Sequence, residues 1–181
     1  MLQITRKADY AVRLMMEVAA HPGETVNTAQ VAKRQDIPRQ FLRKVAQTLT
    51  MNGLLVSERG GNGGLILARP ADQITVLDIL RAVDVLSVND CTIAPDSCQR
   101  RAMCAAYPFW FEAQREMERV LAQTPLSKIA RSHLALEAMA NRSERSQMAP
   151  ELDAERPGSS GRQALQNGNG NRPASERYGF N

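Results

Sequence analysis

The three cysteines of this chain all lie in one short stretch, at Cys91, Cys98 and Cys104. An odd number of cysteines is atypical of a disulfide framework and favours metal or redox chemistry. Thiolates are soft ligands that suit zinc, copper(I) and iron–sulfur clusters. The spacing is C-x6-C-x5-C, whereas zinc modules usually contain a tight C-x2–4-C pair. The spacing alone leaves three alternatives open: an iron–sulfur cluster, a thiol redox sensor, and zinc or no metal.

The positive charge of the chain is concentrated in its N-terminal third. Between Gln30 and Arg69 there are seven basic and two acidic residues, although the formal net charge of the whole chain is only +4. Neutralisation of nucleic-acid phosphates requires such a local excess. The alternative is a solvated basic face without a partner.

Three helices are predicted in this part of the chain. Helical spacing of apolar residues extends from about Thr5 to Ala20, and a short helix follows over about Thr28–Gln35. Pro38 suits the first turn of a third helix, which stops at Asn52-Gly53. Two short helices joined by a tight turn, with a third before them, form a helix-turn-helix unit. We expect the third helix to bury Phe41, Leu42, Val45, Ala46 and Leu49.

A β-hairpin is predicted directly after these helices. Leu54–Val56 is a short apolar strand, Arg59–Gly64 is a glycine-rich tip, and Leu65–Leu67 is the returning strand. The predicted fold class is therefore mainly α with a small β wing, that is, a winged helix-turn-helix followed by a long C-terminal helix, whose role in dimerisation is implied by the family resemblance given below.

This arrangement identifies candidate DNA-binding side chains. A recognition helix presents its N-terminal side chains to base edges, where arginine pairs with guanine and glutamine with adenine. Arg59, beside the wing tip, is expected to enter the minor groove, whose negative potential attracts arginine. The predicted DNA-binding residues are Pro38, Arg39, Gln40, Arg43, Lys44, Arg59 and Asn62.

The remainder of the chain separates into two further parts. Thr75 is expected to cap a helix over about Val76–Val85, and the cysteine segment that follows lacks periodicity. Pro108 begins a longer helix, and a further helix is expected to end near Asn141. The Pro-, Gly-, Ser- and Asn-rich remainder is predicted to be disordered. The expected domains are residues 1–70 for DNA binding, 71–142 for the cysteine segment and dimerisation helices, and 143–181 for the tail.

Other function classes lack sequence support. The chain has no nucleotide-binding loop, no His–Glu metal signature and no nucleophile elbow, so we predict that it is not an enzyme. No apolar run approaches the length of a membrane span, and the polar N-terminus lacks a secretion signal. We expect a cytoplasmic protein.

Several of these motifs together resemble the Rrf-type repressors, the family of IscR and NsrR. The similarity includes the Leu2–Thr5 and Asp9–Arg13 stretches, the wing from Arg59 to Pro70, and Ile74–Ile79 before the cysteines. It extends over about Met1–Arg131. The resemblance implies a homodimer whose long C-terminal helices, here about Pro108–Gln123, pack as an antiparallel pair. It also implies binding to a pseudopalindromic double-stranded DNA operator.

The resemblance further implies that Cys91, Cys98 and Cys104 ligate an iron–sulfur cluster, 4Fe–4S or alternatively 2Fe–2S. The first cysteine gap is six residues here, where five is common in the family. IscR-like members have a histidine three residues after the last cysteine, a position that Tyr107 occupies here. NsrR-like members use an acidic residue of the partner subunit, and Asp9 occupies the matching position; the alternative for Asp9 is a surface pair with Arg13. A repressor that senses nitric oxide or iron and cluster supply is the first interpretation, and a cluster-free thiol redox-sensing winged-helix regulator is the alternative.

Overall fold

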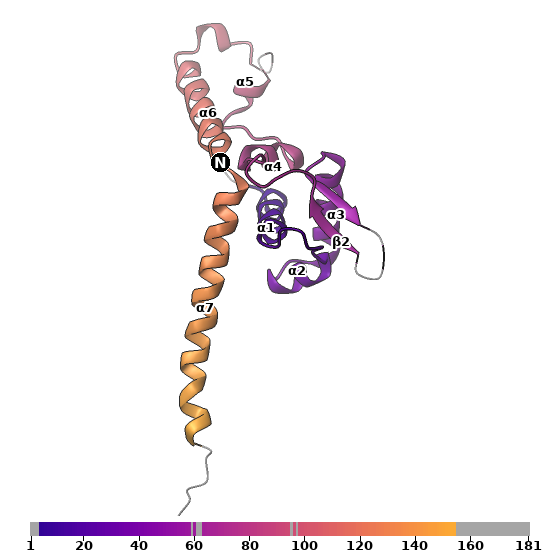
Figure 1. The fold of residues 1–181 in the computed structure, drawn as a ribbon. Coiled ribbons are helices and arrows are strands. Elements are labelled where there is room, and N and C mark those ends of the chain that lie inside the picture. The colour runs from indigo at the N-terminus through magenta and orange to yellow at the C-terminus, as the bar shows by residue number, and fades with distance from the viewer. Residues whose placement is uncertain (1–3, 59, 61–62, 95, 97, 155–181) are drawn as a thin grey trace, which may run out of the picture. The chain divides into compact units, whose positions relative to one another are not determined.

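The computed structural model describes residues 4–154, apart from 59, 61, 62, 95 and 97. The chain divides into two compact units, Met1–Arg142 and Ser143–Asn181, and the packing described below belongs to the first unit. Its described elements are helices apart from one two-stranded antiparallel sheet (Figure 1). The predicted fold class is confirmed.

The first three helices are α1 (Arg6–Ala20), α2 (Thr28–Arg34) and α3 (Arg39–Met51). The side chain of Thr5 caps α1 by accepting a hydrogen bond from the Ala8 amide, and Asn27 caps α2 through the Ala29 amide. Asp36 has a φ of 51° and provides the left-handed residue of the turn between α2 and α3. These local signals produce the expected helix-turn-helix arrangement.

One apolar core joins these helices. The face of α3 that points inward consists of Leu42, Val45, Ala46 and Leu49, each at most 6% exposed. The expectation that Phe41 is buried is wrong, because its side chain is 38% exposed. Phe41 packs edge-on against the ring of Tyr10, with the two ring centroids 5.5 Å apart. Its position at the edge of the α1–α3 contact leaves the rest of the ring accessible to solvent.

The wing consists of β1 (Leu55–Glu58) and β2 (Gly64–Leu67), paired antiparallel so that Leu55 faces Leu67. The amides and carbonyls of Val26 and Leu65 exchange two hydrogen bonds of 2.9 Å, which fasten the α1–α2 loop to β2. A Cβ atom at Gly64 would lie 2.8 Å from the carbonyl oxygen of Val26. Glycine is therefore required here so that the two backbones can approach each other.

The second half of the first unit contains α4 (Val76–Val83), α5 (Asp90–Ile93), a 3-10 turn η2 (Arg101–Met103) and α6 (Tyr107–Ala122). Thr75 and Asp78 form the capping box at the start of α4. The final helix, α7, extends over Leu126–Ala154, whereas the sequence predicted an end near Asn141. Residues 155–181, most of the predicted tail, lie outside the described residues.

A buried ion pair fixes α2 against α1. The side chain of Glu17 on α1 is 2% exposed, and its Oε2 lies 2.6 Å from Nη2 of Arg34. Gln35 donates a second hydrogen bond of 2.8 Å to Oε1. Burial raises the pKa of Glu17, but the hydrogen bonds from Arg34 and Gln35 and the charge of Arg34 outweigh it, so the pKa lies below its ordinary value. The carboxylate is therefore charged in the folded protein at neutral pH.

We expect Arg34→Met to lower the free energy of unfolding at neutral pH by about 1–3 kcal/mol, because it leaves a buried carboxylate without its cation. The expected loss of stability is smaller than for a fully buried ion pair because the Arg34 side chain is 44% exposed. Urea unfolding measures the change. The lowered pKa of Glu17 means that this stabilisation is present at neutral pH and disappears as the pH falls through that pKa. The two chains should therefore converge in stability in acid.

Arg115→Met is the matched control, because it breaks an exposed pair with Glu112 on α6. It should change the free energy of unfolding by less than about 0.5 kcal/mol. An effect of Arg34→Met as small as that of the control would show that the buried pair does not stabilise the fold.

Candidate nucleic-acid interface and cysteine site

The N-terminal half of α3 presents a row of exposed polar side chains. Pro38 is the N-cap residue of α3, and Arg39, Gln40, Arg43 and Lys44 follow it with exposed side chains. None of these four forms an ion pair or a hydrogen bond through its side chain within the described part of the chain. Their donors are therefore available to an external partner such as a phosphate or a base edge.

A depression of about 550 Å³ separates α3 from the wing. Gln40, Arg43 and Lys44 line it, and so do Gln47 and Ser57, which sequence reasoning did not single out. The signal for Gln47 was present, since it follows Arg43 by one helical turn on an exposed face. Ser57 comes from β1, and its proximity to α3 depends on the wing folding back, which no local pattern indicates.

Two predicted DNA-binding residues, Arg59 and Asn62, lie outside the described residues. Glu58 ends β1 immediately before them, so the chain leaves the sheet at the wing tip. Their proposed role at the minor groove stays a prediction.

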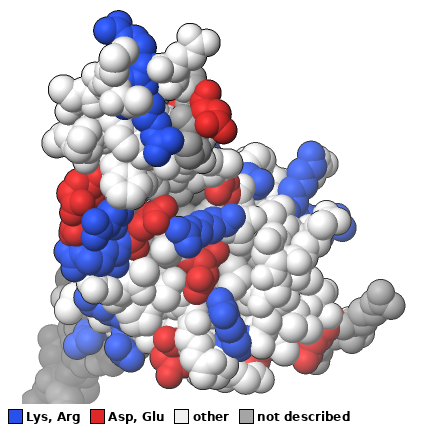
Figure 2. Space-filling model, turned by 90° about the horizontal axis from the view of Figure 1, so that it is seen from above, with Lys and Arg blue, Asp and Glu red and all other residues white. Residues whose placement is uncertain are grey.

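The cations of α6 differ from those of α3. Arg115 and Arg119 pair with Glu112 and Glu116 on the same helix. Figure 2, a view from above the molecule as drawn in Figure 1, shows basic and acidic side chains interspersed over the surface. Paired charges largely cancel, whereas the unpaired cations of α3 produce a local positive field. The arrangement favours α3 over α6 as the nucleic-acid interface.

The cysteines lie on α5 and around η2, and all three are free thiols. Cys91 and Cys104 are partly buried, and Cys98 is exposed. Cys98 and Cys104 line one depression of about 550 Å³, to which Arg101 and Tyr107 also contribute. The guanidinium carbon of Arg101 lies 4.7 Å from the centre of the Tyr107 ring.

A buried amide, Gln114, fastens the start of the cysteine segment to α6. This side chain is 5% exposed. Its Oε1 accepts a hydrogen bond of 2.8 Å from the Val88 amide, and its Nε2 donates to the Leu86 carbonyl at 3.1 Å. The same oxygen lies 3.4 Å from the Thr92 hydroxyl, next to Cys91. Sequence reasoning missed Gln114, because a glutamine in an amphipathic helix is ordinarily a surface residue.

The contacts continue from Gln114 to the helix-turn-helix unit. Nε2 of Gln114 donates to Glu118 at 2.8 Å, and Glu118 pairs with Arg81 of α4 at 3.0 Å. Helix α4 in turn packs against α1 and α3. A continuous set of contacts therefore joins the cysteine segment to the helix that carries the candidate DNA-binding residues.

The two candidate fourth ligands have different surroundings. Asp9 lies on α1 and forms an ion pair of 3.0 Å with Arg13, one turn later. Its side chain is 44% exposed, so the carboxylate is accessible from outside the chain. Tyr107 begins α6 and contacts both Arg101 and the ring of Phe111. Asp9 is not among the residues that line the depression of Cys98 and Cys104.

Comparison with known proteins identifies the family. The family model Rrf2, described as an iron-dependent transcriptional regulator, matches residues 4–132. The chain belongs to the Rrf2 family. This match includes the helix-turn-helix, the wing and all three cysteines. The predicted family resemblance is confirmed.

Individual relatives agree with this assignment. An HTH-type transcriptional regulator of Mycobacterium tuberculosis is 36% identical over 132 residues, which cover 71% of this chain and 81% of the relative. The HTH-type transcriptional regulator IscR of Xenorhabdus nematophila is 30% identical, covering 75% of this chain and 84% of the relative.

Solved structures show the same fold. CymR, the global cysteine regulator of B. subtilis, matches with a TM-score of 0.61 at 25% identity, covering 73% of this chain and 98% of CymR. IscR of T. potens matches with a TM-score of 0.61 at 27% identity, covering 73% and 88% of the two chains.

The family sets the class of function. Its members are transcriptional regulators and not enzymes, and a winged helix in such a regulator implies DNA binding. Within the described part of this Rrf2-family chain, no helix combines the length and the apolar character needed to span a membrane.

Arg43→Ala should weaken binding to an operator and relax the base preference, because it removes an unpaired donor from the exposed face of α3. We expect a loss of about 1–3 kcal/mol in binding free energy to the cognate sequence. Titration of matched and scrambled DNA at fixed salt concentration measures both effects.

Arg115→Ala is the control, since it removes the same charge from α6. It should leave the preference for the matched DNA unchanged. Equal behaviour of the two variants would contradict the assignment of α3 as the interface.

Proposed function

We propose that this Rrf2-family chain is a cytoplasmic homodimeric repressor. It binds a pseudopalindromic operator through α3 and the wing, with Arg59 and Asn62 at the wing tip, and its DNA affinity depends on an iron–sulfur cluster held by Cys91, Cys98 and Cys104. The observation that carries this proposal is the set of three free thiols in one segment linked by Gln114 to α6. We infer that Asp9 of the partner subunit provides the fourth ligand.

The donor set fits a cluster by its chemistry. The Sγ atoms of the three cysteines do not all lie within 4.8 Å of one another, as a single bound ion would need. Several iron atoms spread their thiolate ligands farther apart than one zinc ion does. When bound, a 4Fe–4S cluster would supply a redox-active and nitric-oxide-reactive centre. Three thiolates leave one iron of such a cube for a harder ligand, and a carboxylate oxygen has that character.

The exposed apolar residues of α6 support a dimer. Phe109 is 65%, Phe111 43% and Val120 55% exposed in the single chain. Large apolar side chains grouped on one helix are typical of protein–protein contacts. Phe109 and Val120 share one face of α6, whereas Phe111 lies on the opposite face. A second copy of α6 packed antiparallel would cover Phe109 and Val120 and would produce the two-fold symmetry that a pseudopalindromic operator requires.

The chain's own contacts indicate how a change at the cysteines would reach DNA. Reorganisation of the cysteine segment would break the hydrogen bonds of Val88 and Leu86 to Gln114. Gln114 and Glu118 would then no longer hold Arg81 of α4 in the same position. Because α4 supports α3, the separation of the two recognition helices in a dimer would change. The proposed signal is nitric oxide or the supply of iron and clusters. It would shift the equilibrium between two conformations of the regulator that differ in DNA affinity.

The exposed Cys98 favours one second candidate, a cluster-free thiol redox sensor. Arg100 and Arg101 follow it closely, and nearby cations increase thiol reactivity. Iron and sulfide analysis of anaerobically purified protein, together with a visible spectrum before and after nitric oxide, separates the two candidates.

Replacing any one of Cys91, Cys98 and Cys104 by serine should remove most of the cluster absorbance, because an alcohol is a much harder and weaker ligand than a thiolate. The helical circular dichroism should be retained, since none of the three belongs to the buried core. Retention of full cluster content in any two of the variants would exclude these cysteines as the ligand set.

Asp9→Ala should give a cluster that is lost faster, and DNA binding that depends less on cluster state. Tyr107→Phe is the matched control and should change neither, because a neutral phenol is a poor iron ligand. The measurements are the lifetime of the visible absorbance and the DNA affinity with and without cluster. Loss of the cluster in Tyr107→Phe, together with wild-type behaviour of Asp9→Ala, would place the site in a different subfamily.

A further inference from the structure

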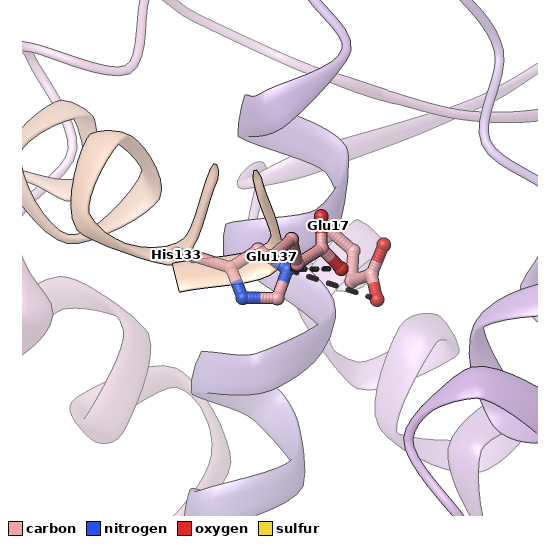
Figure 3. Close-up of side chains that lie close together, drawn as sticks. All are labelled: Glu17, His133 and Glu137. Atoms are coloured by element: carbon pink, nitrogen blue, oxygen red, sulfur yellow. Dashed lines mark ion pairs between the residues drawn. The ribbon is translucent and has the colours of Figure 1, made fainter. Parts of the chain in front are cut away.

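A second group of possible metal ligands lies away from the cysteines, where α7 passes α1. Glu17 of α1, His133 and Glu137 of α7 direct their side chains toward one another (Figure 3). One ligand atom from each of the three lies within 4.8 Å of the other two. Nε2 of His133 is 3.3 Å from Oε1 of Glu137 and 3.9 Å from Oε1 of Glu17.

The imidazole nitrogen in this group lacks a hydrogen-bond partner. Nε2 of His133 is buried and forms no hydrogen bond within the described part of the chain, although carboxylate oxygens of Glu137 and Glu17 lie 3.3 and 3.9 Å from it. A buried polar atom without a partner costs free energy, and in native proteins such atoms are usually satisfied by water or an ion. This nitrogen faces two carboxylates, so a partner placed between them has to attract both the imidazole nitrogen and the carboxylate oxygens.

We propose that Glu17, His133 and Glu137 bind a divalent first-row transition-metal ion such as Mn²⁺, Fe²⁺ or Zn²⁺. One imidazole and two carboxylates are ligands that this class of ion accepts. The His133–Glu137 spacing of four residues places both side chains on one face of α7. Glu17 completes the group from a different helix, so the ion would join two segments that are far apart in the sequence.

The two distances from Nε2 of His133 are near those of four-coordinate metal sites, and the third pair of ligand atoms lies within 4.8 Å. Metal–ligand bonds of about 2.0–2.1 Å correspond to ligand–ligand separations of about 3.4 Å. The 3.3 Å contact already has that length, and the 3.9 Å contact requires a small side-chain movement. The shortest bond of Arg34 is to Oε2 of Glu17, at 2.6 Å, and not to Oε1, the oxygen nearer His133. Oε1 accepts from Gln35 at 2.8 Å and, more weakly, from Nε of Arg34 at 3.4 Å. An ion on Oε1 would replace the long Arg34 contact, and Arg34 would keep its bond to Oε2.

The charge of the surroundings also suits a divalent cation. Glu17 and Glu137 carry two negative charges and Arg34 carries one positive charge, so the group is net negative when His133 is neutral. Binding would hold α7 against α1, and through Arg34 it would also stabilise α2 of the helix-turn-helix unit. This site is separate from the cysteines and does not depend on the proposed cluster.

Binding of Mn²⁺ to the full chain tests the proposal, because Mn²⁺ prefers oxygen and nitrogen ligands over thiolates. Loss of the electron paramagnetic resonance signal of free Mn²⁺ should show one ion bound per chain at neutral pH. His133→Ala and Glu137→Gln should each weaken binding by roughly tenfold or more, since they remove a direct ligand. Glu112→Gln, at an exposed glutamate of α6, is the control and should bind as the wild type does.

A second arm uses Zn²⁺ with a chain in which Cys91, Cys98 and Cys104 are all serine, so that thiols do not compete. Zn²⁺ should raise the Tm of this chain and should not do so when Glu137→Gln is added. Glu17 is left intact in both arms because its removal would leave Arg34 unpaired.

Two outcomes would overturn the metal site. One is that the wild type binds no Mn²⁺, or that His133→Ala and Glu137→Gln bind Mn²⁺ as tightly as the control does. The other is a Tm of the chain without cysteines that Zn²⁺ does not raise, or raises equally when Glu137→Gln is added.

Discussion

A carboxylate that folding buries must be neutralised by groups brought to it, and Glu17 imposes this requirement on the arrangement of the first helices. Apolar contacts between α1 and α3 are tolerant of small rotations, whereas the short bonds from Arg34 and Gln35 to Glu17 are not. An uncompensated charge in that position would cost several kcal/mol. The pair therefore selects the angle of α2 against α1. The tight turn at Asp36 then determines where α3 begins.

The cysteine segment is likewise attached through a buried polar side chain, in this case the neutral amide of Gln114. No described residue between 86 and 106 belongs to the buried core, and the backbone amides of this segment need partners. Gln114 supplies both a donor and an acceptor at one buried point. Gln114 therefore fixes the start of the segment at α6, and α5 packs against the same helix. A segment fastened in this way can rearrange at lower cost than one held by a packed core.

The elements with strong local signals were predictable from the sequence. Helix caps at Thr5, Asn27 and Thr75 and the left-handed Gly53 mark boundaries that the structure shares. The end of α7 was predicted too early, because the stretch from Asn141 to Ala149 lacks an apolar stripe but contains good helix formers and no Gly or Pro. The roles of Glu17, Gln114 and His133 were not predictable, since each depends on partners 17 or more residues away.

The energies of these contacts limit how strongly a change at the cysteines can affect the DNA-binding helix. The Arg81–Glu118 pair between α4 and α6 is partly exposed, and such pairs contribute about 0–1 kcal/mol. Moving a regulator from mostly bound to mostly free requires a difference of several kcal/mol between its states. That ion pair alone is therefore too weak to operate the proposed switch. In the proposed homodimer the larger part would have to come from the geometry of the two subunits, because a small rotation of α6 at a two-fold axis would displace both recognition helices and affect both half-sites at once.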